Sequence, residues 1–250
     1  MKIAVLIKRV PDTAASIRVA GEGKAIAQDV EWILSPYDEM AVEEALRIKE
    51  KLGGNAEVIA ITLCAKDAQS HIRLALEMGA DRAIQLVEGS GERDALGTAR
   101  LLADALKAEN PVLILAGRAA VDLDQSYVPS AVAAILNIAA LSGATKLDIA
   151  NGKAIARREV EGGYEVISAV LPCVVTAQKG LNEPRYPSLK SKMAAKKKTI
   201  EQRPVADSVP KTQLVGYAYP PQRKAGRIVG QGVEAVPALV KILREDIKLF

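Results

Sequence analysis

The stretch that decides the fold is EVIAITLCAKDAQSHIRLALEMGADRAIQLV, residues 57–87. It opens with a nearly continuous aliphatic run over residues 57–63, typical of a strand buried on both faces of a parallel sheet. Asp67 can cap a helix that ends at Gly79. A further strand is expected over residues 82–87. Strand, helix and strand in this order predict one unit of a parallel sheet.

The same alternation continues on both sides of this stretch. Upstream, residues 3–7 form a short buried strand, and a helix begins at Pro36 with carboxylates in its first turn. Downstream, a helix is expected over residues 94–108, and a strand, PVLILA, over residues 111–116. A loop and another helix carry the chain to about residue 138. This alternation over about 140 residues predicts an α/β fold with a doubly wound, mostly parallel sheet.

The pattern changes in the second half of the chain. Short strands separated by glycine-rich turns predict antiparallel additions to the sheet, at residues 147–149, 153–159, 164–170 and 173–176. Residues rich in proline and polar side chains then predict an extended arm, and an amphipathic helix closes the chain. We expect one domain over residues 1–198 and a C-terminal arm with its helix over residues 199–250.

Composition argues against several classes of function. Aromatic residues make up 3% of the 250, which argues against a base-stacking nucleic-acid surface. The opening MKIAVLIKRV is charged too soon for a signal peptide, and no apolar run approaches membrane-spanning length. We therefore expect a soluble, cytoplasmic protein without direct membrane insertion. The two cysteines, Cys64 and Cys173, show no metal-ligand spacing, so no metal site is expected.

Residues for nucleophilic catalysis are missing from the pattern. The single histidine, His71, falls within an expected helix, so a Ser-His-Asp triad in its usual form has no place. Neither a GxGxxG nor a GxxxxGK[ST] motif follows any expected strand. The expected catalytic set is therefore empty, and binding is the function that this pattern favours.

Ligands of open parallel sheets bind at the carboxyl ends of the strands. Here these ends are residues 8–12, 63–65 and 117–128. The third, GRAAVDLDQSYV, is the most suggestive because Gly117 allows a ligand to approach closely. Ser126 and the amides that open the next helix could bind a phosphate. Ordinary turn chemistry is the alternative interpretation of this loop.

A second unusual segment is LNEPRYPSLKSKMAAKKK, residues 181–198. Pro184 and Pro187 predict a stiff loop that leaves the sheet. Leu189 then stands alone beside lysines with no acidic residue among them. An apolar anchor in a cationic tract suits docking onto an acidic protein partner, and a solvated lysine-rich loop is the alternative.

Several segments together resemble one family, the beta subunit of electron transfer flavoproteins. They occur in family order and read VLIKRVPDT (5–13), SPYDEMAVEEALRIKE (35–50), LALEMGADRAI (74–84), GRAAVDLD (117–124), REVEGGYE (158–165), LPCVVTAQKGLNEPRYPSLKSKMAAKKK (171–198) and PPQRKAGR (220–227). The part from NEPRY to KKK is the most specific. The resemblance implies a fold of the adenine-nucleotide-binding (alpha-hydrolase-like) type. It also implies a heterodimer with an alpha subunit, on which the arm and C-terminal helix would pack.

The resemblance further implies two cofactors. FAD would be shared with the alpha subunit, near Thr13, and an AMP would lie buried in this chain. Family contacts to the nucleotide map onto Leu6, Ser35, Pro36, Tyr37, Asp38, Cys64, Gly117, Arg118, Ala119, Ala120, Val121, Asp122, Leu123, Asp124, Gln125, Ser126, Tyr127 and Val128. Tyr127 and Pro129 depart from the glutamine and glycine that are usual in the family.

In family terms, residues 181–198 are similar to a recognition loop that docks onto acyl-CoA dehydrogenases. Leu189 falls on its anchoring leucine. Glu159 matches a glutamate thought to loosen the docked complex so that the flavin domain can swing. The remaining expected docking residues are Arg185, Tyr186, Lys190, Lys196 and Lys197.

The resemblance implies an electron carrier that is not itself a catalyst, since the flavin performs the redox chemistry. Electrons would pass from an acyl-CoA dehydrogenase of fatty acid oxidation, or another flavin dehydrogenase, to the shared FAD. A quinone reductase or a similar acceptor would then receive them. Two alternatives stay open. An electron-bifurcating relative would hold a second FAD in place of AMP and oxidise NADH, and a stand-alone adenine-nucleotide-binding sensor would share the fold.

Overall fold

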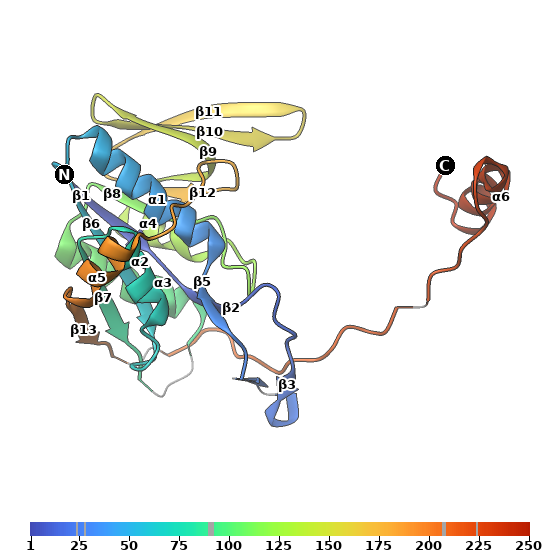
Figure 1. Ribbon diagram of the computed structural model, residues 1–250, viewed down its shortest axis with the longest axis horizontal. Helices are drawn as coiled ribbons and strands as arrows, with labels where there is room; N and C mark the ends of the chain where they lie inside the picture. Colours follow the sequence, from blue (N-terminus) through green and yellow to red (C-terminus); the bar gives the residue numbers. More distant parts are fainter. Residues whose placement is uncertain (24, 28, 90–92, 207–208, 224) are drawn as a thin grey trace.

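The computed structural model describes residues 1–23, 25–27, 29–89, 93–206, 209–223 and 225–250. Within these ranges a nine-stranded sheet forms the centre, with the order β11-β10-β9-β12-β8-β1-β6-β7-β13 (Figure 1). Pairing is parallel from β9 to β13 and antiparallel between β9, β10 and β11. The strands are β1 (Lys2–Leu6), β6 (Glu57–Cys64), β7 (Arg82–Val87), β8 (Leu113–Gly117), β9 (Ala139–Ala150), β10 (Lys153–Val160), β11 (Gly163–Val170), β12 (Cys173–Ala177) and β13 (Ile200–Pro204).

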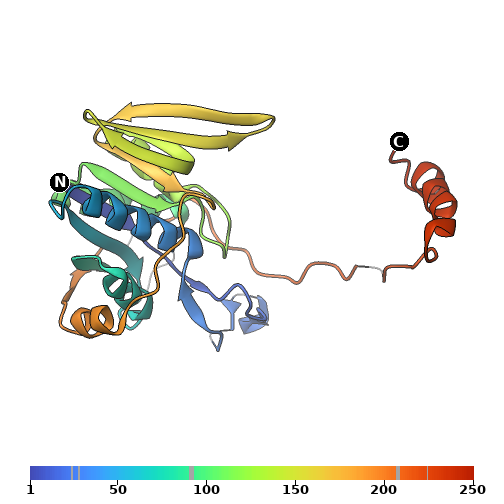
Figure 2. The same cartoon turned by 45° about the horizontal axis from the view of Figure 1, so that its top comes forward.

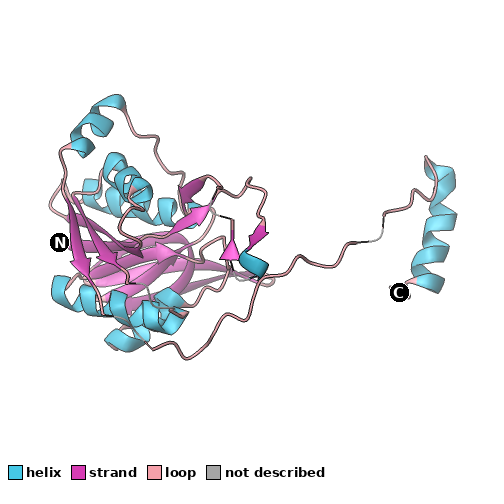
Figure 3. Cartoon of the chain, turned by 90° about the horizontal axis from the view of Figure 1, so that it is seen from below, coloured by secondary structure: helices cyan, strands magenta, loops and turns pink. Residues whose placement is uncertain are grey.

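Helices cover both faces of this sheet (Figure 3). One face carries α1 (Pro36–Lys51) and α2 (Ser70–Met78), with α5 (Leu189–Lys196) beside them. The opposite face carries α3 (Ala95–Glu109) and α4 (Val128–Leu136). The predicted fold class, a doubly wound α/β fold with a mostly parallel sheet and antiparallel additions, is confirmed.

The core is divided by the sheet because neighbouring strand residues point to opposite faces. In β1, Ile3 and Val5 belong to the cluster under α1 and α2, whereas Ala4 and Leu6 belong to the cluster under α3 and α4. All four are buried. A strand buried on both sides needs apolar residues at every position, which explains the unbroken aliphatic runs of the sequence.

Three local expectations were wrong. Residues 173–176, expected as an antiparallel addition, lie in β12 inside the sheet, which pairs in parallel with both β8 and β9. Asp67 does not cap α2, which begins at Ser70 after Gln69, and Asp67 instead lies in a preceding turn. Strand β9 begins at Ala139, directly after α4, whereas the sequence indicated a strand only from residue 147. The first half of β9, AALSGA, consists mostly of small residues with little intrinsic strand preference. Parallel pairing with β12 imposes the strand conformation there.

The C-terminal region begins inside the sheet. We expected the arm to start at residue 199, but residues 200–204 pair with β7 as the edge strand β13. Farther on, the Tyr217 amide donates to the Gly23 carbonyl over 2.6 Å, and the Val19 amide donates to the Tyr219 hydroxyl over 2.9 Å. These bonds fix the arm beside a short N-terminal hairpin of β3 (Val19–Ala20), η1 (Gly21–Gly23) and β4 (Ala25–Ile26).

Beyond this hairpin the arm runs away from the sheet domain (Figures 1 and 2). It ends in a helical segment that lies apart from the sheet, formed by η2 (Val233–Ala235), α6 (Val236–Lys241) and η3 (Ile242–Asp246). The remaining strands, β2 (Arg9–Pro11) and β5 (Trp32–Leu34), pair with each other near the start of α1. Across the described ranges, no helix combines the length and apolar character needed to cross a membrane.

Candidate functional site at the carboxyl ends of the strands

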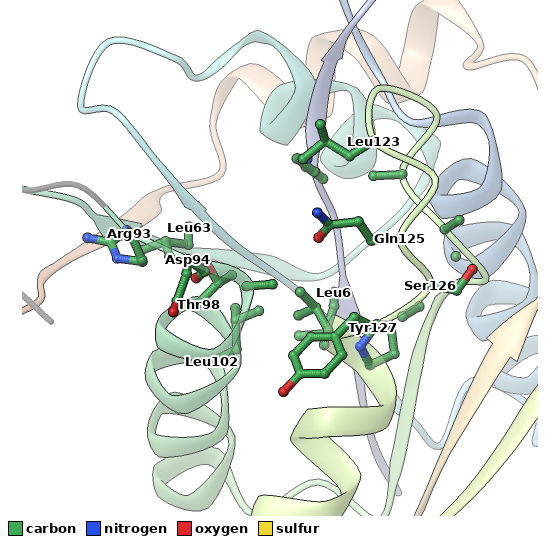
Figure 4. A pocket seen from close by; sticks show the side chains of 18 of the residues that line it. Leu6, Leu63, Arg93, Asp94, Thr98, Leu102, Leu123, Gln125, Ser126 and Tyr127 are labelled. Atoms are coloured by element: carbon green, nitrogen blue, oxygen red, sulfur yellow. Dashed lines mark hydrogen bonds between the residues drawn. The ribbon is translucent and has the colours of Figure 1, made fainter. Parts of the chain in front are cut away.

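A cavity of about 640 Å³ opens at the carboxyl ends of β1 and β8, with walls from the ends of β6 and β7. The chain passes from β1 through α1 to β6 on one side. It returns from β7 through α3 to β8 on the other side of β1. The cavity therefore lies at the topological switch point, where doubly wound sheets bind ligands. In Figure 4, Thr98 and Leu102 of α3 face Gln125 and Tyr127 across it.

Many of the residues expected from the sequence meet in this cavity. The end of β1 and the loop after β8 are separated by about a hundred residues in the chain, and both contribute to the walls. The expected residues that line the cavity are Leu6, Asp38, Gly117, Ala119, Ala120, Leu123, Gln125, Ser126, Tyr127 and Val128.

Other expected residues lie outside the lining. Cys64 is buried in the cluster under α1 and α2, because its neighbour Leu63 takes the face that borders the cavity. Thr13 is exposed in the loop after β2. The remaining ones lie at the start of α1 or in the loop after β8 without lining the cavity and are Ser35, Pro36, Tyr37, Arg118, Val121, Asp122 and Asp124.

Asp38 joins the two central strand ends. It is the third residue of α1, and its Oδ2 accepts a hydrogen bond from the Lys8 amide over 2.8 Å. Its Oδ1 accepts one from the Gly117 amide over 2.9 Å. Burial raises the pKa of Asp38 to about 7, although the two amides and the Lys8 ammonium partly oppose this.

Gly117 is required by this close contact. A Cβ atom at residue 117 would lie 2.4 Å from the Asp38 Oδ1 and 2.7 Å from the Tyr37 Cβ. Any side chain would therefore push the carboxylate away from the strand end. The sequence predicted that a ligand approaches Gly117 closely, whereas in the structure the close approach is made by α1 of the same chain.

The loop after β8 is shaped by backbone geometry and one ion pair. Asp124 and Ser126 have positive φ angles of 47° and 51°, which turn the chain back toward the start of α4. The Lys8 Nζ lies 2.6 Å from the Asp122 Oδ2 and holds the loop to the end of β1. Tyr127, Val128 and Pro129 bring the N-terminus of α4 to the cavity. This end carries a partial positive charge, although Pro129 has no amide to donate.

The wall that α3 and the arm form was not predicted from the sequence. Asp94 caps α3, since its Oδ1 accepts from the Gly97 amide over 2.7 Å. Its Oδ2 accepts from the arm amides of Lys211 and Thr212 over 2.6 and 3.2 Å. These backbone hydrogen bonds lower the pKa of Asp94. The arm residues that line the cavity are Thr212, Gln213, Leu214 and Tyr217.

One residue of this wall could have been recognised in the sequence. An aspartate that precedes a helix and follows a strand marks a strand end, so Asp94 was recognisable. The arm had none, because a proline-rich polar segment carries no periodicity that shows where it packs. Lys8 and Leu63, at the strand ends expected from the sequence, also line the cavity, as does Pro129. Other lining residues that the sequence did not single out are Ile7, Glu88, Arg93, Ala95, Thr98, Leu102 and Ala116.

The expected docking residues fall into three groups. Tyr186, in the loop before α5, and Leu189 and Lys190, at its start, are exposed, as are Lys196 and Lys197 at its end. Arg185 instead turns inward onto α1. Glu159 is exposed on β10, toward the β11 edge of the sheet, whereas α5 packs on α2 toward the β13 edge. The structure therefore places Glu159 and the lysine-rich helix toward opposite ends of the sheet.

The fold and the cavity define a class: doubly wound α/β proteins with a ligand-sized cavity at the switch point. The family model described as the electron transfer flavoprotein domain matches residues 23–208. The chain is also similar to three proteins named electron transfer flavoprotein subunit beta. That of Bacillus subtilis (strain 168) is 39% identical over 100% of both chains. That of Syntrophomonas wolfei is 41% identical over 90% of this chain and 88% of the relative. That of Sus scrofa is 38% identical over 98% of this chain and 97% of the relative.

The chain belongs to the electron transfer flavoprotein family, and within it to the beta subunits. It is thus a subunit of an electron-carrying flavoprotein and not an enzyme of the usual kind.

Proposed function

We propose that this chain is the beta subunit of a heterodimeric electron carrier. It accepts electrons from an acyl-CoA dehydrogenase or another flavin dehydrogenase and passes them to a quinone reductase or a similar acceptor. FAD, shared with an alpha subunit, supplies the redox chemistry, and an AMP occupies the cavity of this chain. The observation that carries the proposal is α5, which presents apolar side chains within a set of exposed lysines.

The apolar side chains of α5 form a compact surface. Leu189 and Met193 are 79% and 55% exposed, and they lie on one face of the helix because four residues separate them. Tyr186, 98% exposed, precedes them in the loop. Exposed side chains of this size serve as anchors at protein interfaces, where their burial supplies much of the binding free energy.

The lysines of α5 add charge to this surface. Lys190, Lys192, Lys196 and Lys197 are exposed, and none of them forms an ion pair with any residue that the structure describes. Lys198 differs, because its Nζ donates to the Ala80 carbonyl and so helps to hold the helix in place. Free ammonium groups favour a partner with an acidic surface and increase the rate of encounter.

The arm supports an obligate partner. Val215, Ile228 and Phe250 are exposed along the arm and at its end, where the sheet domain offers them no cover. Exposed apolar side chains spread along an extended segment are typical of a chain that wraps around another subunit. An alpha subunit is the partner that the family relationship suggests for them.

The cavity suits a mononucleotide. Leu6, Leu63 and Leu102 supply apolar surface for a base. Lys8 and Arg93, which are ion-paired with Asp122 and Glu88, supply donors for a phosphate together with the N-terminus of α4. The Arg93 side chain is buried, and its Nε has no hydrogen-bond partner among the described residues. The arm crosses the side near α3, which favours AMP over a second FAD because a dinucleotide needs more open space.

Nucleotide analysis of the purified heterodimer tests the proposal. Extraction should release one FAD and one AMP per heterodimer. Release of two FAD, together with reduction of the protein by NADH, would contradict the simple carrier and identify an electron-bifurcating protein. A chain that is monomeric, stable and nucleotide-loaded without an alpha subunit would instead be a sensor.

A further inference from the structure

We propose that Arg185 is a positioning residue that fixes the docking helix α5 from one end, while Arg73 fixes it from the other. The inference rests on the proposed function of α5 as the docking surface. Arg185 then does not contact the partner itself but supports, from beneath, the surface that does.

The contacts of Arg185 all point toward α1. Its Nε and Nη2 form a fork onto the Glu43 carboxylate at 2.7 and 3.0 Å. Its Nη1 and Nη2 donate to the Glu50 carboxylate over 2.6 and 3.2 Å. Each guanidinium nitrogen is thus bonded within the chain. Glu43 is only 3% exposed, so the fork reaches a buried acceptor.

Glu43 and Glu50 lie two turns apart on the same side of α1, with Arg47 between them. The Arg47 Nε also donates to Glu43, over 2.9 Å. Burial alone would raise the pKa of Glu43, but the hydrogen bonds from Arg185 and Arg47 outweigh it and hold that pKa below its usual value. The α1 surface is therefore an anionic acceptor that keeps its charge at neutral pH.

A second bond secures the same loop. The Asn182 Nδ2 donates to the Met40 carbonyl over 3.0 Å and to the Glu44 carboxylate over 2.9 Å. Asn182 and Arg185 stand on either side of Pro184, whose ring limits the backbone between them. The loop is thus attached to α1 at two points immediately before Tyr186 and Leu189.

The C-terminal end of α5 is held by α2. The Arg73 Nη1 donates to the Ala195 and Lys198 carbonyls, each over 2.9 Å. These carbonyls belong to the last turn and to the second residue beyond it, where a cation also complements the helix dipole. Ala195 is fully buried at this contact. An eight-residue helix is too short to be stable alone, so its shape depends on these supports.

A docking surface that is ordered before binding loses less entropy when a partner arrives. If Arg185 orders α5, its removal should weaken docking without changing the flavin. The effect should therefore appear in the half-saturating concentration of the dehydrogenase, and the limiting rate at saturation should stay the same.

The test uses the heterodimer with Arg185→Gln, Arg185→Lys and Leu189→Ala. Amide hydrogen exchange over residues 182–196, without dehydrogenase, should accelerate about tenfold in Arg185→Gln and remain unchanged in Leu189→Ala. The half-saturating dehydrogenase concentration should rise about tenfold in Arg185→Gln. Arg185→Lys should fall between, because an ammonium cannot form the fork. Arg100→Gln, which removes an exposed arginine from α3 on the opposite face, is the matched control.

Glu50→Gln gives an independent variant if Arg185→Gln fails to fold, since Glu50 lies at the surface. It should accelerate exchange over the same residues, and the double variant should add little to Arg185→Gln alone. If Arg185→Gln weakens docking but leaves hydrogen exchange unchanged, Arg185 contacts the partner directly and the inference is overturned. The inference is also overturned if neither docking nor exchange changes. Faster exchange in Arg185→Gln with unaltered docking in Leu189→Ala would leave the support intact and overturn the docking function.

Discussion

The carboxylate of Asp38 connects the ends of β1 and β8 through two backbone amides, those of Lys8 and Gly117. Its position in the first turn of α1 was visible in the sequence as a residue that suits a helix start. Its role as a bridge was not, because the two amides come from strands that meet only in the folded sheet.

The raised pKa of Asp38 leads to a prediction about pH. The folded protein binds a proton at Asp38 up to about pH 7, whereas the unfolded chain releases it near 3.8. Since the folded state holds more protons between these values, this residue makes the protein less stable as pH rises from 4 to 7. The loss is at most about 4 kcal/mol. Lys8 and Asp122 are the charged groups near the carboxylate.

Asp38→Asn should remove this dependence. Urea unfolding of the heterodimer at fixed concentration, at pH 4.5 and 7.5, should show a smaller fall in stability for the variant than for the natural protein. An equal fall in both would show that Asp38 is ionised across this range.

Gly117→Ala should destabilise the protein by about 1–3 kcal/mol and lower its AMP content. The added methyl group would displace the Asp38 carboxylate and separate the strand ends. Gly163→Ala is a matched control, because no atom lies within 4 Å of a Cβ at that position. Thermal unfolding and nucleotide content should change in the first variant alone.

In the proposed docking by α5, both the fixed shape of the helix and its exposed side chains contribute. Leu189→Ala should raise the half-saturating concentration of the dehydrogenase by at least about tenfold, the range expected for an interface anchor. FAD content should be unaltered. Stopped-flow reduction at several dehydrogenase concentrations measures the effect, and Leu52→Ala, a partly exposed leucine at the end of α1, serves as the control. Equal kinetics in both variants would contradict the anchor.

The lysines of α5 should govern the salt dependence of docking. Replacing Lys196 and Lys197 with glutamine should flatten the fall of the association rate with ionic strength, since two steering charges are lost. Lys51 and Lys107, exposed on α1 and α3, provide a control that removes the same charge elsewhere. An equal slope for the two double variants would assign the effect to net charge alone.

The arm has two proposed roles, as a wall of the cavity and as a contact for the alpha subunit. Removing residues 221–250 should weaken heterodimer assembly but preserve AMP, because Asp94 still binds the arm at Lys211 and Thr212. Removing residues 206–250 should release AMP as well, since that wall of the cavity is lost. Size-exclusion chromatography and nucleotide analysis after co-expression with the alpha subunit distinguish the two. AMP retained in the shorter chain would show that the arm is not part of the site.

Local pattern was enough to predict the fold, because a doubly wound sheet repeats one strand–helix unit and each unit has its own periodicity. Local pattern also predicted that the loop after β8 lies at the edge of the sheet where the cavity opens. Contacts between distant segments could not be predicted. Asp94 and the arm amides lie 117 and 118 residues apart, and the fork of Arg185 spans 142 residues. Cys64 was placed at the site from the sequence but lies on the other face of the sheet. A shift of one residue along a strand decides which face a side chain occupies, and the sequence pattern does not fix position that closely.

The extended arm also has a kinetic consequence. Residues 220–232 are thirteen residues, which reach about 40 Å when fully extended. A subunit held by both ends of this tether meets the second site at an effective concentration in the millimolar range after the first is bound. Either contact can then open and close many times while the other holds the chains together. The subunits can therefore move relative to each other without dissociation of the heterodimer.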